Sequence, residues 1–418
     1  MSSKFKYRPI PIVKLLTRMQ DISNLILDLA YATVIFDSPY LRKEVFHLEE
    51  ELDYLIIMLE LQTMLATRDL EDAEANIAFL RIGQAMNEIS DAAADIANLS
   101  MEGTGVGRII GYVLEKGDEQ IYRLKITNES WSGLTKASLN DVEELFGVDF
   151  MTIYRDNKYI FNLEPKTKLK KNDTVIVRGS KNALSVLKKT TLGDLKDEKS
   201  IVETMESYQE ELEEPIKVSS NERKCVQIIA SLKKKSELAV DLAFSALLMN
   251  DKRLAEEVIR LETELDNLDR QLGIEALNLH SQTLDLNQQE SIWNLIRLSK
   301  ALEEISDAAY LIIDPFRREM EVPPLLKDII QKSEEKNSLY EVEEDSEAVN
   351  SSIEEFERKV HGMWVVAIYR KEIGYIFDPP ANFIIEPCDT LIFKAYGRPK
   401  KRITLFEEGE SIFRGIKK

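Results

Sequence analysis

Cysteine is nearly absent from this sequence. Only Cys225 and Cys388 occur among 418 residues, and they lie far apart without a CxxC spacing. Neither a disulfide framework nor a thiolate zinc site is therefore indicated. We expect two buried thiols in a reducing compartment.

Long apolar runs are also missing. The most apolar stretch, from Asn24 to Phe36, is too short to span a bilayer and is interrupted by Asp28. The N-terminal segment MSSKFKYRPIPIVKLL lacks the apolar core and small-residue end of a signal peptide. The sequence predicts a soluble, cytoplasmic protein without direct membrane insertion.

Catalytic signatures are missing as well. The sequence contains no GxSxG, no P-loop and no GxGxxG, and no nucleophile has a base beside it. The glycine cluster at 103–107 follows a predicted helix and not a strand, which favours a hinge over a phosphate site. We therefore expect no catalytic residues and no enzymatic activity.

Acidic residues outnumber basic residues in this sequence. The net charge is -19, with 44% hydrophobic and 31% charged residues. This composition is typical of a globular protein, and the length favours two to four domains. The acidic excess disfavours binding to nucleic acid or to an anionic membrane surface, and it favours cationic partners.

An internal repeat organises the chain. The segment from Asp28 to Asp53 matches the segment from Asp241 to Asp266, and EISDAAADIA at 88–97 matches EISDAAYLII at 304–313. Ile-Tyr-Arg at 153–155 recurs at 368–370, and Asn-Asp-Thr at 172–174 recurs as Cys-Asp-Thr at 388–390. Because four blocks recur in one order at nearly one shift, we predict a composite unit present twice in tandem.

Apolar periodicity separates helical from extended segments. Apolar residues recur every three to four positions over about 10–98 and 222–313, which predicts helices. Breaks near 37–39, 67–69, 250–251 and 285–287 divide each stretch into three. After each stretch the period shifts towards two, as in TVIVRGS and DTLIFKAYG, and one short helix per copy should end at Gly147 or Gly362.

These signals predict an α+β fold in which two three-helix bundles alternate with two small α/β domains. The expected segments are a bundle over 1–105, an α/β domain over 106–190, a linker over 191–220, a bundle over 221–325 and an α/β domain over 326–418. The linker is charged and has little apolar periodicity.

The helical segments resemble PhoU domains, which are three-helix bundles with paired carboxylate motifs. The matching residues of the first copy are Glu49, Asp53, Glu88, Asp91 and Asp95. The second copy keeps Glu262, Asp266, Glu304 and Asp307, but Leu311 replaces the last aspartate. The resemblance implies that these nine carboxylates bind a metal ion.

The α/β segments resemble TrkA-C domains, the C-terminal part of regulators of potassium conductance, in their Ile-Tyr-Arg and NDTVIVRG motifs. The alternating order resembles archaeal proteins that join PhoU and TrkA-C domains. The resemblance implies a small ligand on the α/β domains, cyclic di-AMP or another nucleotide, at residues that it does not identify. The second copy has YEVEEDSEAV in place of SWSGLT at 130–135, which leaves its ligand binding open.

Helix geometry groups the carboxylates independently of the resemblance. Spacings of three, four and seven place them on one helical face, where like charges repel. A divalent or iron-type cation would relieve that repulsion, since carboxylates suit magnesium, calcium, manganese and iron. The alternative is a solvated acidic face, and Asp28 and Asp241 are either further ligands or packing carboxylates.

A di-iron centre is disfavoured. Glu44 and His47 have the ExxH spacing of carboxylate-bridged di-iron bundles, but such sites need it twice. The second copy has Arg260 where His47 would be. We therefore expect His47 to be a surface residue.

Together these patterns predict a non-enzymatic cytosolic regulator of cation transport, acting on potassium or alternatively magnesium. Its partner would be a membrane cation transporter or channel, and its like domains would pair within the chain or in a homodimer. A PhoU-type regulator of phosphate uptake is one alternative, and a carboxylate metal-dependent phosphohydrolase or an inert scaffold are others. The first copy is favoured for sensing, because it keeps Asp95 and SWSGLT.

Overall fold

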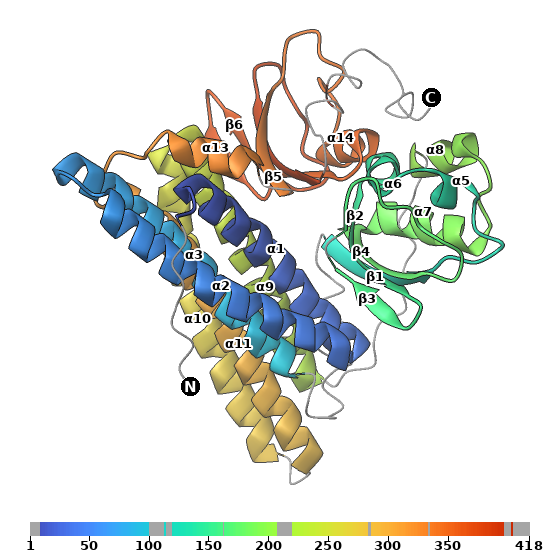
Figure 1. Cartoon of the computed structure of the whole chain (residues 1–418), viewed down its shortest axis with the longest axis horizontal. Coiled ribbons are helices and arrows are strands. Elements are labelled where there is room, and N and C mark those ends of the chain that lie inside the picture. The colour runs from blue at the N-terminus through green and yellow to red at the C-terminus, as the bar shows by residue number, and fades with distance from the viewer. Residues whose placement is uncertain are drawn as a thin grey trace. The chain divides into compact units, whose positions relative to one another are not determined.

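The computed structural model describes residues 9–99, 119–161, 163–206, 220–282, 286–332 and 335–396, together with 113 and 403. The chain divides into two compact units, and each draws on both halves of the sequence. Residues 1–114 and 218–333 form the helical unit, and residues 115–217 and 334–418 form the α/β unit. Like segments therefore group with like within one chain (Figure 1).

The helical unit contains six long helices. They are α1 (Ile12–Phe36), α2 (Pro39–Ala66), α3 (Leu70–Asn98), α9 (Ser220–Met249), α10 (Lys252–Gln282) and α11 (Leu286–Ile312). Local chemistry sets their ends: Ser38 accepts a hydrogen bond from the backbone N–H of Leu41, and Asp69 accepts one from that of Asp72. The predicted breaks near 37–39, 67–69 and 250–251 are confirmed, and the fourth, near 285–287, lies partly outside the described residues.

The two three-helix groups pack on one another through α3 and α11. The short helices α12 (Asp314–Arg317) and α13 (Leu325–Lys332) follow α11, and α13 contacts α1 and α9. Leu326, Ile329 and Ile330 of α13 are buried. The predicted domain boundary at 325 is therefore wrong, because this apolar face belongs to the helical core.

The α/β unit holds two sheets of identical strand order. The first module consists of β1 (Glu119–Lys125), α5 (Gly133–Lys136), α6 (Leu139–Phe146), β2 (Val148–Arg155), β3 (Lys158–Ile160), β4 (Thr174–Ser180), α7 (Lys181–Leu192) and α8 (Glu198–Glu206). The second consists of β5 (Glu335–Glu341), α14 (Ile353–Val360), β6 (Met363–Arg370), β7 (Gly374–Phe377) and β8 (Thr390–Tyr396).

Both sheets are antiparallel, in the orders β1-β4-β2-β3 and β5-β8-β6-β7. Each has a register shift at the same point, between Phe150 and Thr152 in one and between Val365 and Ala367 in the other. Gly147 ends α6 in the left-handed conformation, as predicted. In the second module His361 caps α14, and the left-handed Gly362 follows it.

The predicted linker over 191–220 is wrong in its first half. Residues 198–206 form α8, whose Ile201 and Met205 are fully buried in the core of the first module. Residues four apart lie on the same face of a helix, so these two side chains can anchor α8 to the module although most of its other residues are charged or polar. The rest of the predicted linker, 207–219, lies outside the described residues, as does the glycine cluster at 103–107.

One strand was not predicted, and one further expectation is corrected. Strand β5 has no clear sequence signal, because EKNSLYE contains few strand-forming residues. Cys225 is buried as expected, but Cys388 is exposed in the left-handed turn that precedes Asp389.

Within the part of the chain that the structure describes, none of the helices combines the length and the apolar character needed to cross a bilayer. This agrees with the interruption of the first helix by charged residues.

Candidate functional site

The nine carboxylates predicted as metal ligands lie on four helices of the helical unit. We call them the carboxylate patch: Glu49 and Asp53 on α2, Glu88, Asp91 and Asp95 on α3, Glu262 and Asp266 on α10, and Glu304 and Asp307 on α11. In both copies the glutamates are half-buried and the aspartates are exposed. The two copies thus present the same pattern along the edge of the helical core.

Electrostatic coupling joins the two copies across α3 and α11. Burial raises the pKa of Glu88 above its usual value, and the nearby charge of Asp307 raises it further. Burial likewise raises the pKa of Glu304, and the charge of Asp95 adds to that shift. Carboxylates of the two copies therefore lie close enough on α3 and α11 for their charges to interact.

The same coupling runs along the outer helices. Burial raises the pKa of Glu49, and the charges of Asp53 and Asp91 raise it further. Burial raises the pKa of Glu262, with Asp266 and Asp307 as additional causes. The pKa values of Asp91 and Asp307 are raised as well, again chiefly by burial. Concentrated negative charge of this kind attracts cations.

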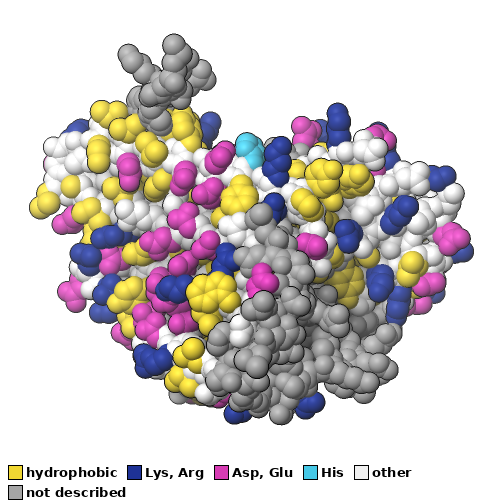
Figure 2. Space-filling model, turned by 90° about the horizontal axis from the view of Figure 1, so that it is seen from below, with side chains coloured by type: hydrophobic (Ala, Val, Ile, Leu, Met, Phe, Trp, Pro, Cys, Tyr) yellow, Lys and Arg dark blue, Asp and Glu magenta, His cyan; other side chains and the backbone are white. Residues whose placement is uncertain are grey.

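Ligand geometry is a separate question from charge. Among the residues that the structure describes, no three carboxylate, imidazole or thiol groups lie close enough together to hold a metal ion. The donor chemistry suits a hard cation, but the side chains are not arranged around one. Metal binding by the patch therefore stays a prediction. Figure 2 shows acidic side chains gathered on one part of the surface, with apolar side chains between them.

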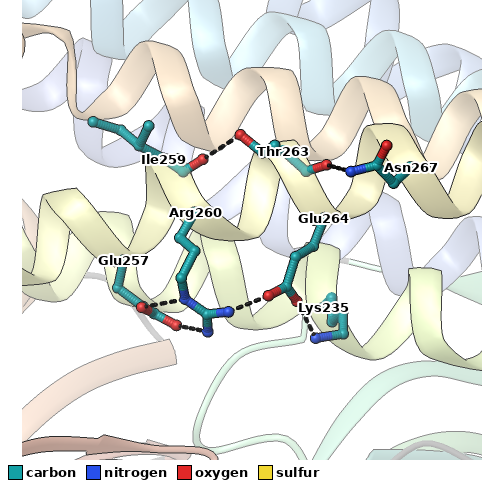
Figure 3. Close-up of polar contacts among 7 residues, drawn as sticks. All are labelled: Lys235, Glu257, Ile259, Arg260, Thr263, Glu264 and Asn267. Atoms are coloured by element: carbon teal, nitrogen blue, oxygen red, sulfur yellow. Dashed lines mark hydrogen bonds and ion pairs between the residues drawn. The ribbon is translucent and has the colours of Figure 1, made fainter.

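The ExxH spacing of the first copy corresponds to an ion pair in the second. Arg260 on α10 lies between Glu257 and Glu264 and is hydrogen-bonded to both (Figure 3). Lys235 on α9 donates to Glu264 at 2.7 Å, which links the two helices. His47 is exposed, as expected. Arg260 therefore forms ion pairs on α10 at the position that corresponds to His47.

A second network, which the spacing of motifs did not reveal, joins the two bundles. Asp314, which begins α12 and is buried, forms ion pairs with Arg81 of α3 at 3.2 Å and with Arg318 at 2.6 Å. Arg81 lies in the first copy and Asp314 in the second. The sequence gives one indication of this ion pair. The position of Asp314 in the second copy is occupied by Asn98 in the first, so the two copies differ there in charge.

The motifs shared by the α/β modules form a buried ion pair. Arg155 of Ile-Tyr-Arg donates to both oxygens of Asp173, from Nε at 2.8 Å and from Nη2 at 2.6 Å. Arg370 donates to Asp389 in the same way, at 2.8 Å for each bond. Bidentate pairs of this kind fix geometry as well as adding stability. The recurring motifs therefore hold the ends of two strands together.

The two modules meet through equivalent glycines. A Cβ atom on Gly147 would collide with the backbone of Gly362, and one on Gly362 would collide with that of Gly147. Nearby, the guanidinium of Arg178 lies over the ring of Tyr396, 4.7 Å from its centroid, and pairs with Asp149 at 2.8 Å. The modules are thus paired within one chain through close backbone approach and a cation–π contact.

The SWSGLT segment has structural contacts. The hydroxyl of Ser130 donates to the carbonyl of Thr191 at 2.5 Å, and the backbone N–H of Trp131 donates to that of Thr190 at 3.1 Å. Trp131 packs on the core of the first module. The segment therefore ties β1 to the end of α7, and a role in ligand binding stays a prediction.

Comparison with protein families places two known domains in the second copy. Residues 229–314 match the PhoU domain and residues 338–397 match the TrkA-C domain. The chain therefore contains these domains in tandem, one in each unit. Both matches lie in the second copy, although the first copy keeps Asp95 and SWSGLT. No curated protein matches the chain.

Solved structures give weak likenesses. PhoU from Pseudomonas aeruginosa is 12% identical over 73% of this chain and 97% of its own, with a TM-score of 0.38. The GsuK channel bound to NAD is 10% identical over 81% of this chain and 66% of its own, with a TM-score of 0.18. The GsuK RCK domain is 10% identical over 81% and 79%, also with a TM-score of 0.18. Likenesses this distant say nothing about function.

Proposed function

We propose that this chain is a non-enzymatic regulator of cation transport, in which the α/β unit senses a small ligand and the helical unit contacts a membrane transporter or channel. The observation that carries the proposal is the presence of a PhoU domain and a TrkA-C domain in one chain. Both are families of regulatory domains.

The pairing of like modules supplies a physical basis for regulation. A ligand that binds one relative orientation of the two α/β modules more tightly than another shifts the population towards that orientation. The close Gly147–Gly362 approach and the Arg178–Tyr396 contact are the points that such a shift would change. The helical unit would then change its affinity for the partner. Ligand binding on the α/β unit and partner binding on the helical unit would thus be linked by a coupling free energy.

The finer assignments belong to the same proposal. The transported ion is potassium, with magnesium as the alternative, and the ligand is cyclic di-AMP or another nucleotide. A divalent or iron-type cation binds the carboxylate patch, where it would offset the repulsion that adds to burial in raising the pKa values of Glu88 and Asp307. The chain acts at the cytoplasmic side of the membrane.

A PhoU-type regulator of phosphate uptake is the second candidate, and the PhoU match at 229–314 favours it. It differs from the first candidate in the transported solute. The paired TrkA-C-like modules favour cation transport, because a phosphate regulator would need only the helical unit.

Uptake measurements separate the two. In cells that lack the chain, uptake of rubidium, as a tracer for potassium, should change and be restored by the full-length protein. A change in phosphate uptake alone would support the second candidate. Unchanged uptake of rubidium, magnesium and phosphate would show the proposal to be wrong. Metal-dependent hydrolysis of phosphate esters by the pure protein, abolished by Asp91→Ala, would replace it with an enzyme.

A further inference from the structure

One end of the first bundle exposes a cluster of large apolar side chains. Between 42% and 76% of each side chain is exposed on the last turns of α2 and the first turns of α3. We call this cluster the tip surface: Ile57, Met64, Leu65, Leu70 and Ile77. It surrounds the turn between α2 and α3, at one end of the long helices (Figure 1).

The tip surface is separate from the core face of the same helices. On α2, Leu55, Met58 and Leu59 are buried against the bundle, whereas Ile57 and Met64 point to solvent. Ile57, Leu61, Met64 and Leu65 recur at spacings of four, three and one, which places them on one second face of α2. A contiguous exposed apolar face of this kind is typical of an interaction site.

Acidic residues surround the tip surface. Between 57 and 77 the acidic residues are Glu60, Asp69, Glu71, Asp72 and Glu74, and the only basic residue is Arg68. Arg68 pairs with Asp72 at 3.0 Å, so its charge is partly compensated within the tip. Residues 57–77 thus combine exposed apolar side chains with a net charge of -4, from five acidic residues and one basic residue.

The second bundle repeats the feature in a weaker form. Ile274, Leu277 and Trp293 are between 57% and 67% exposed near the corresponding end of α10 and α11. Leu277 occupies the position of Met64 and Trp293 that of Ile77, while Arg270 and Asn278 replace Ile57 and Leu65. The positions of Met64 and Ile77 are thus apolar and exposed in both copies. This recurrence indicates an apolar surface, because a single exposed apolar residue would not be expected to recur.

We propose that the tip surface is the docking site for a basic amphipathic segment in a cytoplasmic loop of the membrane partner. This rests on the proposed function. Cytoplasmic loops of membrane proteins carry an excess of lysine and arginine, which complements the acidic surround. An amphipathic helix would place its apolar side on the tip surface.

Charge also argues against the other occupants. The cytoplasmic leaflet is negative and repels an acidic tip, which disfavours a lipid surface. A second copy of the chain would bring two acidic tips together, and like charges in contact disfavour association. A basic protein segment avoids both costs.

The test uses full-length protein and native membranes washed free of the endogenous chain. The variant Met64→Ser/Leu65→Ser/Leu70→Ser should lower the bound fraction about tenfold, because three contact side chains lose their apolar area together. The matched control Leu192→Ser/Ile373→Ser removes similarly exposed apolar residues from the α/β unit and should bind within about twofold of wild type. Both variants should melt within about 2 °C of wild type, since the changed side chains are exposed.

Further arms identify the occupant. Trypsin treatment of the membranes should abolish binding of the wild-type chain, and vesicles of extracted lipid should not bind it. Equal binding to those vesicles would overturn the proposal in favour of a lipid surface, and a wild-type dimer that the tip variant splits would overturn it in favour of self-association. If the tip variant binds native membranes like wild type, the docking site is wrong but the proposed function stands. If wild type binds no native membranes, both are wrong.

Discussion

The two bundles place their carboxylates alike but surround them differently. In each copy a half-buried glutamate lies near an exposed aspartate on both facing helices. In the second copy Lys300 pairs with Glu303 and lowers the pKa of Glu304 against the effect of burial, whereas the first copy has Gln84 and Asn87 at those positions. In the first copy Arg81 also lowers the pKa of Glu88, but as the weakest of the causes that act on it. The first copy thus carries the less compensated negative charge.

The two α/β modules also share some side-chain interactions and differ in others. Both keep the Arg–Asp ion pair that joins strand ends. The cross-strand pair of Asp149 and Arg178 in the first module is replaced by Trp364 and Lys394 in the second. The ion pair within each module and the glycines at the contact are therefore retained, whereas this cross-strand pair differs between the copies.

The largest expected effect comes from removing the shared ion pair. Asp173→Ala should lower the free energy of unfolding by about 3 kcal/mol, because it leaves Arg155 without its buried partner. Asp389→Ala should cost about 1 kcal/mol less, since Glu386 lies 2.8 Å from Arg370 and remains as a partner. Urea unfolding followed by tryptophan fluorescence measures both changes.

The variant Glu386→Gln supplies the control for this comparison. In its background Asp389→Ala should become as costly as Asp173→Ala. If Asp389→Ala lowers the free energy of unfolding more than Asp173→Ala in the wild-type background, Glu386 does not replace Asp389 as the partner of Arg370. The proposed difference between the two modules would then be wrong.

An intermediate effect is expected at the contact between the modules. Gly147→Ala should lower the free energy of unfolding by more than about 2 kcal/mol, because alanine is strained at a φ of 66° and would also collide with Gly362. Gly374→Ala serves as control: it has a φ of 93° but open space around it, so only the backbone cost of about 1 kcal/mol applies. Calorimetry measures both, and equal losses would show that the paired glycines do not hold the modules together.

The smallest expected effect concerns the carboxylate patch. A carboxyl group whose pKa is raised on folding binds more protons folded than unfolded, so it lowers stability as pH rises above its unfolded value, 4.5 for glutamate. Glu88→Gln should therefore raise the free energy of unfolding at pH 7 by a few tenths of a kcal/mol, and Glu304→Gln by less, because Lys300 already offsets part of the repulsion. Urea titrations followed by circular dichroism at pH 7 and pH 4 measure the difference.

The gain from Glu88→Gln should disappear towards pH 4, where the wild-type side chain is itself protonated. A larger gain for Glu304→Gln than for Glu88→Gln would contradict the inequality between the bundles. In a Lys300→Gln background the two gains should become similar.

Much of the local structure could be predicted from sequence. Period-three-to-four apolar residues located the six long helices, and Ser38, Asp69 and Gly147 marked ends where their side chains or conformational freedom are needed. The short elements α8, α13 and β5 were missed. Their formation depends on partners distant in the chain, such as the core that buries Ile201 and Met205.

The candidate site divides in the same way. Helical spacing alone placed Glu88, Asp91 and Asp95 on one face, because 3.6 residues complete a turn. The approach of Glu88 to Asp307, and the buried pair of Arg81 with Asp314, depend on how α3 packs against α11. Spacing within one helix carries no information about the register of a second helix.

Sequence by itself determined the repeat, the helix and strand periods and the faces on which charged residues lie, since each is set by local geometry. Tertiary structure decided that like modules pair within one chain, that carboxylates of the two copies lie close enough for their charges to interact, and that the Ile-Tyr-Arg and Asp-Thr motifs meet as an ion pair. These features join residues far apart in the chain, and their contact free energies arise only once the cores have brought those residues together.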